Sequence, residues 1–65
     1  MSFRQMRNRR LIHGISKKAV AERIGCSYAW VDTLDRGLYD GPSSERWRKR
    51  YEDGLNALIE EKRGR

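Results

Sequence analysis

A three-residue break with the letters "GCS", residues 25–27, constrains the fold more than any other feature, because it separates two short helical patterns and leaves no room for a longer connection. The patterns cover residues 17–24 and 28–36, and their inward-facing apolar positions are Val20, Ala21, Ile24, Val31 and Leu34. Gly25 permits a left-handed turn, and Ser27 can cap the second helix. Since Ala21 is small enough for two helix axes to approach closely, the segment predicts a helix-turn-helix.

The rest of the chain adds two more helical patterns, and no β-branched run with a period of two indicates a strand. Ser2 and Gln5 have capping-box spacing, which predicts a helix over about 3–13. After the loop "LYDGP", Ser43 or Ser44 can cap a long helix over about 43–62. We therefore predict an all-α fold, a compact bundle of four to five helices forming one domain over 1–62, with a frayed tail at 63–65.

The length and the scarcity of ligating residues exclude several classes of protein. The 65 residues include one cysteine, Cys26, and one histidine, His13, so neither an internal disulfide nor a structural zinc site is expected. No apolar run exceeds four residues, which predicts neither a secretion signal nor a membrane span and favours the cytoplasm. No nucleophile and base constellation or glycine-rich phosphate loop is present, so we expect no enzyme activity, no cofactor and no small-molecule ligand.

The positive charge lies at the two ends of the chain. The net charge is +6; residues 1–18 carry six bases and no acid, whereas residues 19–42 carry two bases and four acids. A surplus of this kind favours a polyanionic partner, first of all nucleic acid, because neutralised phosphates release their counterions. An anionic membrane surface is the weaker interpretation, since the bases do not lie opposite one strongly apolar helix face.

The segment "RLIHGISKKAVAERIGCSYAWVDTLDRG", with the "GPS" that follows, resembles the lambda-type repressor and Cro family of phage and bacterial regulators. The shared pattern is an Arg, three residues, Gly, an apolar residue and Ser, then Ala, Gly-apolar-Ser, an apolar residue and acid-x-Gly. The resemblance covers residues 10–43. It implies a lambda-repressor-like helical bundle that binds double-stranded operator DNA as a dimer and regulates transcription. The expected binding site is an inverted repeat.

The resemblance also implies residue roles, with the helix over 28–36 in the major groove. The base-reading positions would be Ser27, Tyr28, Ala29, Asp32 and Thr33. The phosphate-contacting positions would be Arg7, Arg9, Arg10, Lys17, Lys18, Arg36 and Arg46. Lys17 replaces the Gln that is usual in the family, and Arg10 and Asp35 match a pair of residues that form an ion pair there. Trp30 is interpreted as packing against the second or fourth helix, with base stacking as the alternative.

The fourth helical segment carries a long apolar stripe, which we interpret as part of a two-fold dimer interface. Its members are Tyr51, Gly54, Leu55, Leu58 and Ile59. The alternative is that this end folds back on the first helix. Two other functions stay open: a helix-turn-helix that holds another protein, such as an antirepressor or a polymerase adaptor, through its aromatic residues, and an excisionase-like architectural DNA binder.

Overall fold

The computed structural model describes residues 2–64, and this part of the chain forms four α-helices and no strand. The helices are α1 (Phe3–Ile12), α2 (Lys17–Ile24), α3 (Tyr28–Asp35) and α4 (Ser44–Arg63). The predicted all-α class is confirmed, and each predicted helix boundary agrees with the observed one to within one residue. Arg63, which we assigned to the tail, is the last residue of α4, and residue 65 lies outside the described residues.

Serine side chains begin the first three helices. The Ser2 hydroxyl accepts from the backbone of Gln5 in a capping box, Ser16 accepts from Ala19, and Ser27 accepts from Trp30 at 3.1 Å. Gly25 closes α2 with a φ of 74°, a left-handed conformation that glycine adopts without a steric penalty. These local signals fix where α2 ends and α3 begins, so the turn between them is as short as the sequence predicts.

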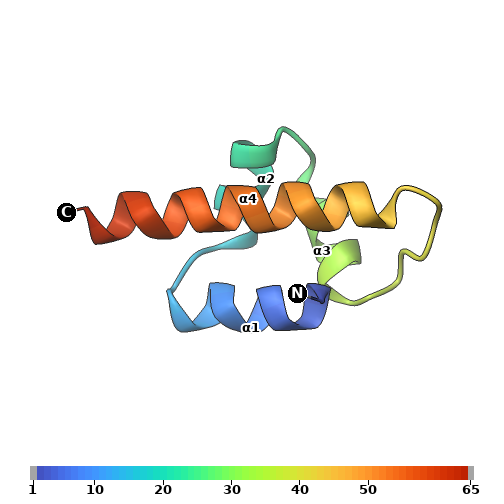
Figure 1. The fold of residues 1–65 in the computed structure, drawn as a ribbon, viewed down its shortest axis with the longest axis horizontal. Coiled ribbons are helices and arrows are strands. Elements are labelled where there is room, and N and C mark those ends of the chain that lie inside the picture. Colours follow the sequence, from blue (N-terminus) through green and yellow to red (C-terminus); the bar gives the residue numbers. More distant parts are fainter. Residues whose placement is uncertain (1, 65) are drawn as a thin grey trace.

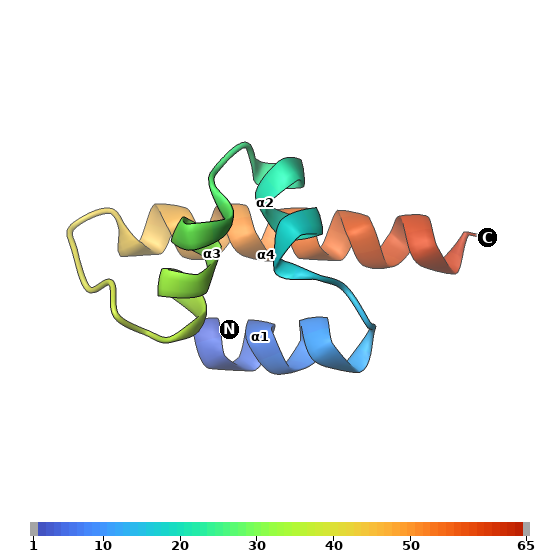
Figure 2. The ribbon, with the colours of Figure 1, turned by 180° about the vertical axis from the view of Figure 1, so that it is seen from behind.

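The long helix α4 runs the length of the molecule, and α1 lies beside it with the same chain direction (Figure 1). From behind, α2 and α3 are seen in front of α4, with the short turn between them pointing away from α1 (Figure 2). Helix α2 packs against both α3 and α4, and α1 packs against both α3 and α4. The helix-turn-helix therefore rests on a base made by the first and last helices.

One apolar core joins all four helices. Its buried members are Met6, Ile15, Val20, Ala21, Ile24, Val31, Leu34, Tyr51, Leu55 and Ile59. Trp30, Trp47 and Leu58 pack against its edge. Within residues 2–64, no helix combines the length and the apolar character that crossing a membrane requires.

The predicted dimer stripe of α4 is part of this core, so that prediction is wrong for four of its five residues. Tyr51, Gly54, Leu55 and Ile59 are buried within the single chain, and Leu58 is half-buried. At Gly54 the helix that approaches closely is α2 of the same chain, because a Cβ there would clash with Cγ2 of Ile24. The α4 stripe thus stabilises the fold of one protomer.

Candidate nucleic-acid interface

The N-terminal end of α3 is exposed while its opposite face is buried. Ser27, Tyr28 and Ala29 are exposed, with 56% of Tyr28 accessible, whereas Val31 and Leu34 lie in the core. This contrast follows from the helical period, which turns Val31 and Leu34 toward α2 and leaves the first turn outside. Three of the five predicted base-reading residues are therefore on one accessible end of the helix.

The other two predicted base-reading residues are half-buried and already hydrogen-bonded. The Thr33 hydroxyl donates to the carbonyl of Ala29 at 3.0 Å, one turn earlier in α3. Asp32 is bonded to two basic side chains. At Thr33 the hydrogen-bond donor is thus used within the helix, which leaves the methyl group as the part suited to an apolar contact with a base.

A basic cleft opens beside α3, where the start of α1, the start of α2 and the end of α3 meet. Its lining residues are Arg4, Arg7, Lys17, Asp32, Asp35, Arg36 and Gly37. Three predicted phosphate ligands are brought together here: Arg7 of α1, Lys17 of α2, and Arg36 just after α3. Arg4 is a fourth cation that the sequence analysis missed, although its position three residues before Arg7 places both side chains on the same side of α1.

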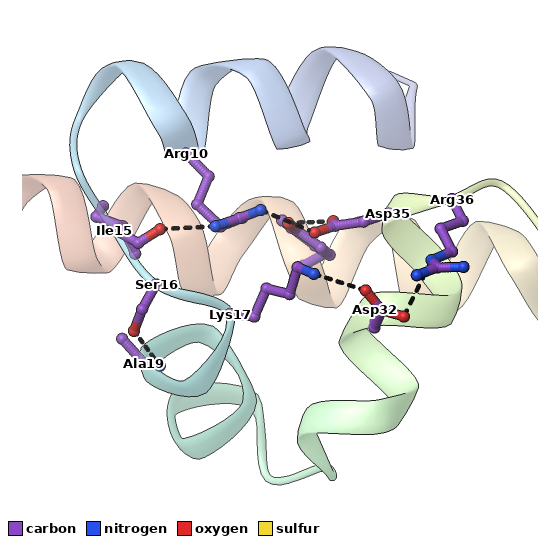
Figure 3. Close-up of polar contacts among 9 residues, drawn as sticks. Arg10, Ile15, Ser16, Lys17, Ala19, Asp32, Asp35 and Arg36 are labelled. Carbon is purple, nitrogen blue, oxygen red and sulfur yellow. Dashed lines mark hydrogen bonds and ion pairs between the residues drawn. The ribbon is translucent and has the colours of Figure 1, made fainter.

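Asp32 lies between two of the cations of this basic cleft. Its Oδ1 accepts from Nζ of Lys17 at 2.6 Å, and its Oδ2 lies 3.1 Å from Nε of Arg36 (Figure 3). The hydrogen bond from Lys17 lowers the pKa of the Asp32 carboxyl, and the same bond raises the pKa of Lys17. Lys17 also lies 5.6 Å from the ring centre of Tyr28, within cation–π range.

Arg10 is not a phosphate ligand, because it is buried. Only 5% of its side chain is exposed, and Nη2 pairs with Oδ2 of Asp35 at 3.0 Å, which confirms the predicted ion pair. Its Nη1 donates to the carbonyl of Ile15 at 2.9 Å, so the guanidinium also holds the α1–α2 connection (Figure 3). The other Asp35 oxygen accepts from the Tyr51 hydroxyl at 2.6 Å, which links α1, α3 and α4 in one buried network.

The remaining predicted phosphate ligands lie outside the basic cleft. Arg9 is half-buried and donates to the side chain of Asn56 on α4. Lys18 is exposed in the first turn of α2, and Arg46 is exposed near the start of α4, where it lines a separate surface hollow. Of the seven predicted phosphate ligands, the structure assembles Arg7, Lys17 and Arg36 in one cleft.

Trp30 packs against the fourth helix, as the sequence analysis predicted. Its ring lies 5.4 Å from that of Trp47 on α4 and 4.9 Å from that of Tyr39 in the preceding loop, both edge to face. This contact anchors the loop between α3 and α4. These contacts use the Trp30 ring within the fold, which favours packing over base stacking as its role.

Within residues 2–64, no group of three or more His, Cys, Asp or Glu side chains is arranged to hold a metal ion. Comparisons of the chain with protein families, with curated proteins and with solved structures found no match.

Proposed function

We propose that this protein is a sequence-specific regulator of transcription that binds double-stranded DNA in the manner of repressor and Cro proteins, with α3 in the major groove. The observation that carries the proposal is the basic cleft beside α3, from which Lys17 extends to within 5.6 Å of the ring centre of Tyr28 at the exposed N-terminal end of that helix. Four cations line the cleft: Arg4 and Arg7 of α1, Lys17 of α2, and Arg36 just after α3. A duplex seated on α3 brings its phosphates to this cleft.

The separation of charge within the surface supports this assignment. The exposed positions Ser27, Tyr28 and Ala29 at the start of α3 carry no charge, whereas the cleft toward the other end of this helix is basic. Phosphate contacts position a protein on DNA, and contacts to base edges specify the sequence, so the two tasks fall to different residues. Tyr28 supplies a hydroxyl to a base or a phosphate, and Ala29 and Thr33 supply methyl groups to thymine.

Two copies on an inverted repeat are part of the proposal, but their contact must use a surface other than the buried stripe of α4. Leu55 is fully buried within one protomer and Ile59 is 2% exposed, so neither is accessible to a second copy. The spacing between the two half-sites of an operator would report how the two copies are arranged, because this spacing follows from the dimer geometry.

The alternative in which the helix-turn-helix holds another protein has less support. Its expected aromatic anchors are engaged within the fold: Trp30 packs between Tyr39 and Trp47, and Tyr51 is fully buried. Among residues 2–64, Tyr28 is the only aromatic residue that is exposed instead of half-buried or buried. A protein interface usually needs a cluster of such anchors at its centre.

Selection of bound duplexes from a random-sequence pool at physiological salt tests the proposal with the full chain. Enrichment of a sequence motif is the expected result, and an inverted repeat would establish two copies per site. The Tyr28→Ala variant serves as the control, because the substitution alters the exposed end of α3 without touching the core. Recovery of unselected sequence by the wild type, with no salt-dependent binding, would contradict the proposal.

A further inference from the structure

The carboxylate of Asp32 occupies the place in the basic cleft where an anion would sit. One of its oxygens lies 2.6 Å from Nζ of Lys17, and the other lies 3.1 Å from Nε of Arg36. Lys17 begins α2, whereas Arg36 follows α3 four residues after Asp32, so the carboxylate holds the start of α2 beside the end of its own helix (Figure 3). The side chain of Asp32 is 27% exposed, which leaves it within reach of solvent and of a bound duplex.

The other two cations of the cleft are placed differently. Arg4 and Arg7 are exposed on α1, and neither forms an ion pair among residues 2–64. The basic cleft thus holds two cations that share one carboxylate and two that form no ion pair. Release of Asp32 would raise the number of unpaired cations in the cleft from two to four.

We propose that Asp32 competes with DNA phosphates for Lys17 and Arg36. This competition weakens binding to random duplex and thereby raises sequence selectivity. The inference rests on the proposed function, because it assumes that duplex DNA is seated on α3. A phosphate group reaches Lys17 and Arg36 at full strength only when the carboxylate leaves them. A carboxylate next to a phosphate is repelled unless it receives a hydrogen bond in exchange.

That exchange defines the class of sequence that would be favoured. The donors on base edges in the major groove are the exocyclic amino groups, N4 of cytosine and N6 of adenine, and an Asp can accept from them. Where such an amino group faces Asp32, the carboxylate gains a partner as Lys17 and Arg36 turn to phosphates. Where the groove presents an acceptor or a methyl group instead, the carboxylate is left without one, and binding is penalised.

The test measures binding of a labelled random-sequence duplex by fluorescence anisotropy across a salt series, using the full chain. The variant is Asp32→Asn, which keeps the shape and removes the charge. The matched control is Glu61→Gln, because Glu61 pairs with Arg23 at 2.7 Å and lies near the far end of α4, outside the basic cleft. Both variants raise the net charge by one; Asp32→Asn releases Lys17 and Arg36 inside the basic cleft, whereas Glu61→Gln releases Arg23 outside it.

For Asp32→Asn we expect tighter binding to random duplex and a slope of log affinity against log salt that is steeper by about 0.9 to 1.8, since one or two more cations contact phosphates. Between about 50 and 200 mM salt this difference costs the variant an extra factor of about 3 to 12 in affinity. The Glu61→Gln variant should keep the wild-type slope. In selection from a random pool, Asp32→Asn should enrich its motif less strongly than the wild type does.

An affinity and a slope for Asp32→Asn that match those of Glu61→Gln would overturn the inference while leaving the proposed function intact. Absence of salt-dependent duplex binding by the wild type would overturn the proposed function and, with it, the inference. Circular dichroism confirms that each variant is folded. Asp32→Ser, which removes both carboxylate oxygens, provides an independent second variant with the same expected direction of change.

Discussion

Two aspartates on α3, three residues apart, show how burial divides the work of one helix. Asp35 is buried with 1% of its side chain exposed, and it binds Arg10 of α1 and the Tyr51 hydroxyl of α4. Asp32 is 27% exposed and binds Lys17 of α2 and Arg36 just after α3. Each carboxylate thus accepts from two side chains, but one pair of bonds lies inside the protein and the other borders the solvent.

The difference shows which charges belong to the fold and which are available for binding. The partners of Asp35 cannot exchange it for water or for DNA, so this network ties three helices together. The partners of Asp32 can exchange it, because each is at least partly exposed. An ion pair at the surface is weakened by solvent and salt, whereas a buried one leaves an unpaired charge behind when it is broken.

The largest effect on stability is expected when the buried carboxylate of Asp35 is removed. Asp35→Ala leaves the Arg10 guanidinium buried without its counter-ion, which we expect to lower the free energy of unfolding by about 3 to 5 kcal/mol. Since small domains are stabilised by only about 5 to 15 kcal/mol, this loss removes a large part of the stability and should shift the urea midpoint strongly downward. Urea denaturation followed by circular dichroism measures the loss.

The same substitution three residues earlier provides the control. Asp32→Ala removes a carboxylate whose partners remain hydrated, so its denaturation midpoint should stay close to that of the wild type. Equal destabilisation by the two substitutions would show that burial does not distinguish these aspartates.

Much of the fold was predictable because its signals are local. Capping serines, left-handed glycines and the spacing of apolar residues act within a few positions, and they set the helix boundaries to within one residue. The partner of Gly54 was not predictable in this way. A glycine on an apolar face indicates that something approaches closely, but the pattern does not say whether Ile24 of the same chain or a second copy fills the space.

The site was predictable where residues follow the helical period. Arg7 and Arg9 differ by two positions, which turns them about 200° apart on α1, so one side chain lines the basic cleft and the other reaches Asn56 on α4. Applied strictly to α1, the helical period places Arg4 with Arg7 in the cleft and excludes Arg9 from it. Of the two contacts of Asp32, the one with Arg36 follows the helical period, because the two residues are four positions apart. The hydrogen bond from Lys17 depends on how α2 meets α3 in space.

A smaller effect is expected at the edge of the buried network. Tyr51→Phe removes a hydroxyl that donates to Oδ1 of Asp35 at 2.6 Å. Because the acceptor is charged, we expect a loss of about 1.5 to 3 kcal/mol in the free energy of unfolding, less than for Asp35→Ala. Tyr28→Phe, which changes an exposed tyrosine, serves as the control in the same denaturation assay. A loss no greater than that of Tyr28→Phe would place Tyr51 outside the network.

Alkaline solution probes the same hydroxyl without changing the rest of the network. Burial and the neighbouring Asp35 raise the pKa of Tyr51 above its ordinary value. Above about pH 10 a tyrosine in the unfolded chain loses its proton while Tyr51 in the folded chain keeps it, so unfolding is favoured as pH rises. We expect the denaturation midpoint of the wild type to fall in this range and that of Tyr51→Phe to fall less. Parallel curves would contradict this origin of the alkaline sensitivity.

The smallest effect is expected for an exposed cation of the basic cleft, and it concerns DNA binding while stability stays nearly unchanged. Arg7 is exposed and lines the basic cleft, whereas Arg9 is half-buried and bonded to Asn56. If the cleft grips the DNA backbone, Arg7→Ala removes one phosphate contact and makes the salt dependence of duplex binding shallower by about 0.9. Arg9→Ala should keep the wild-type salt dependence, although both substitutions remove the same charge from the same helix. Duplex titrations at several salt concentrations distinguish the two variants, and identical slopes would mean that total charge, rather than the position of α1 against α3, governs binding.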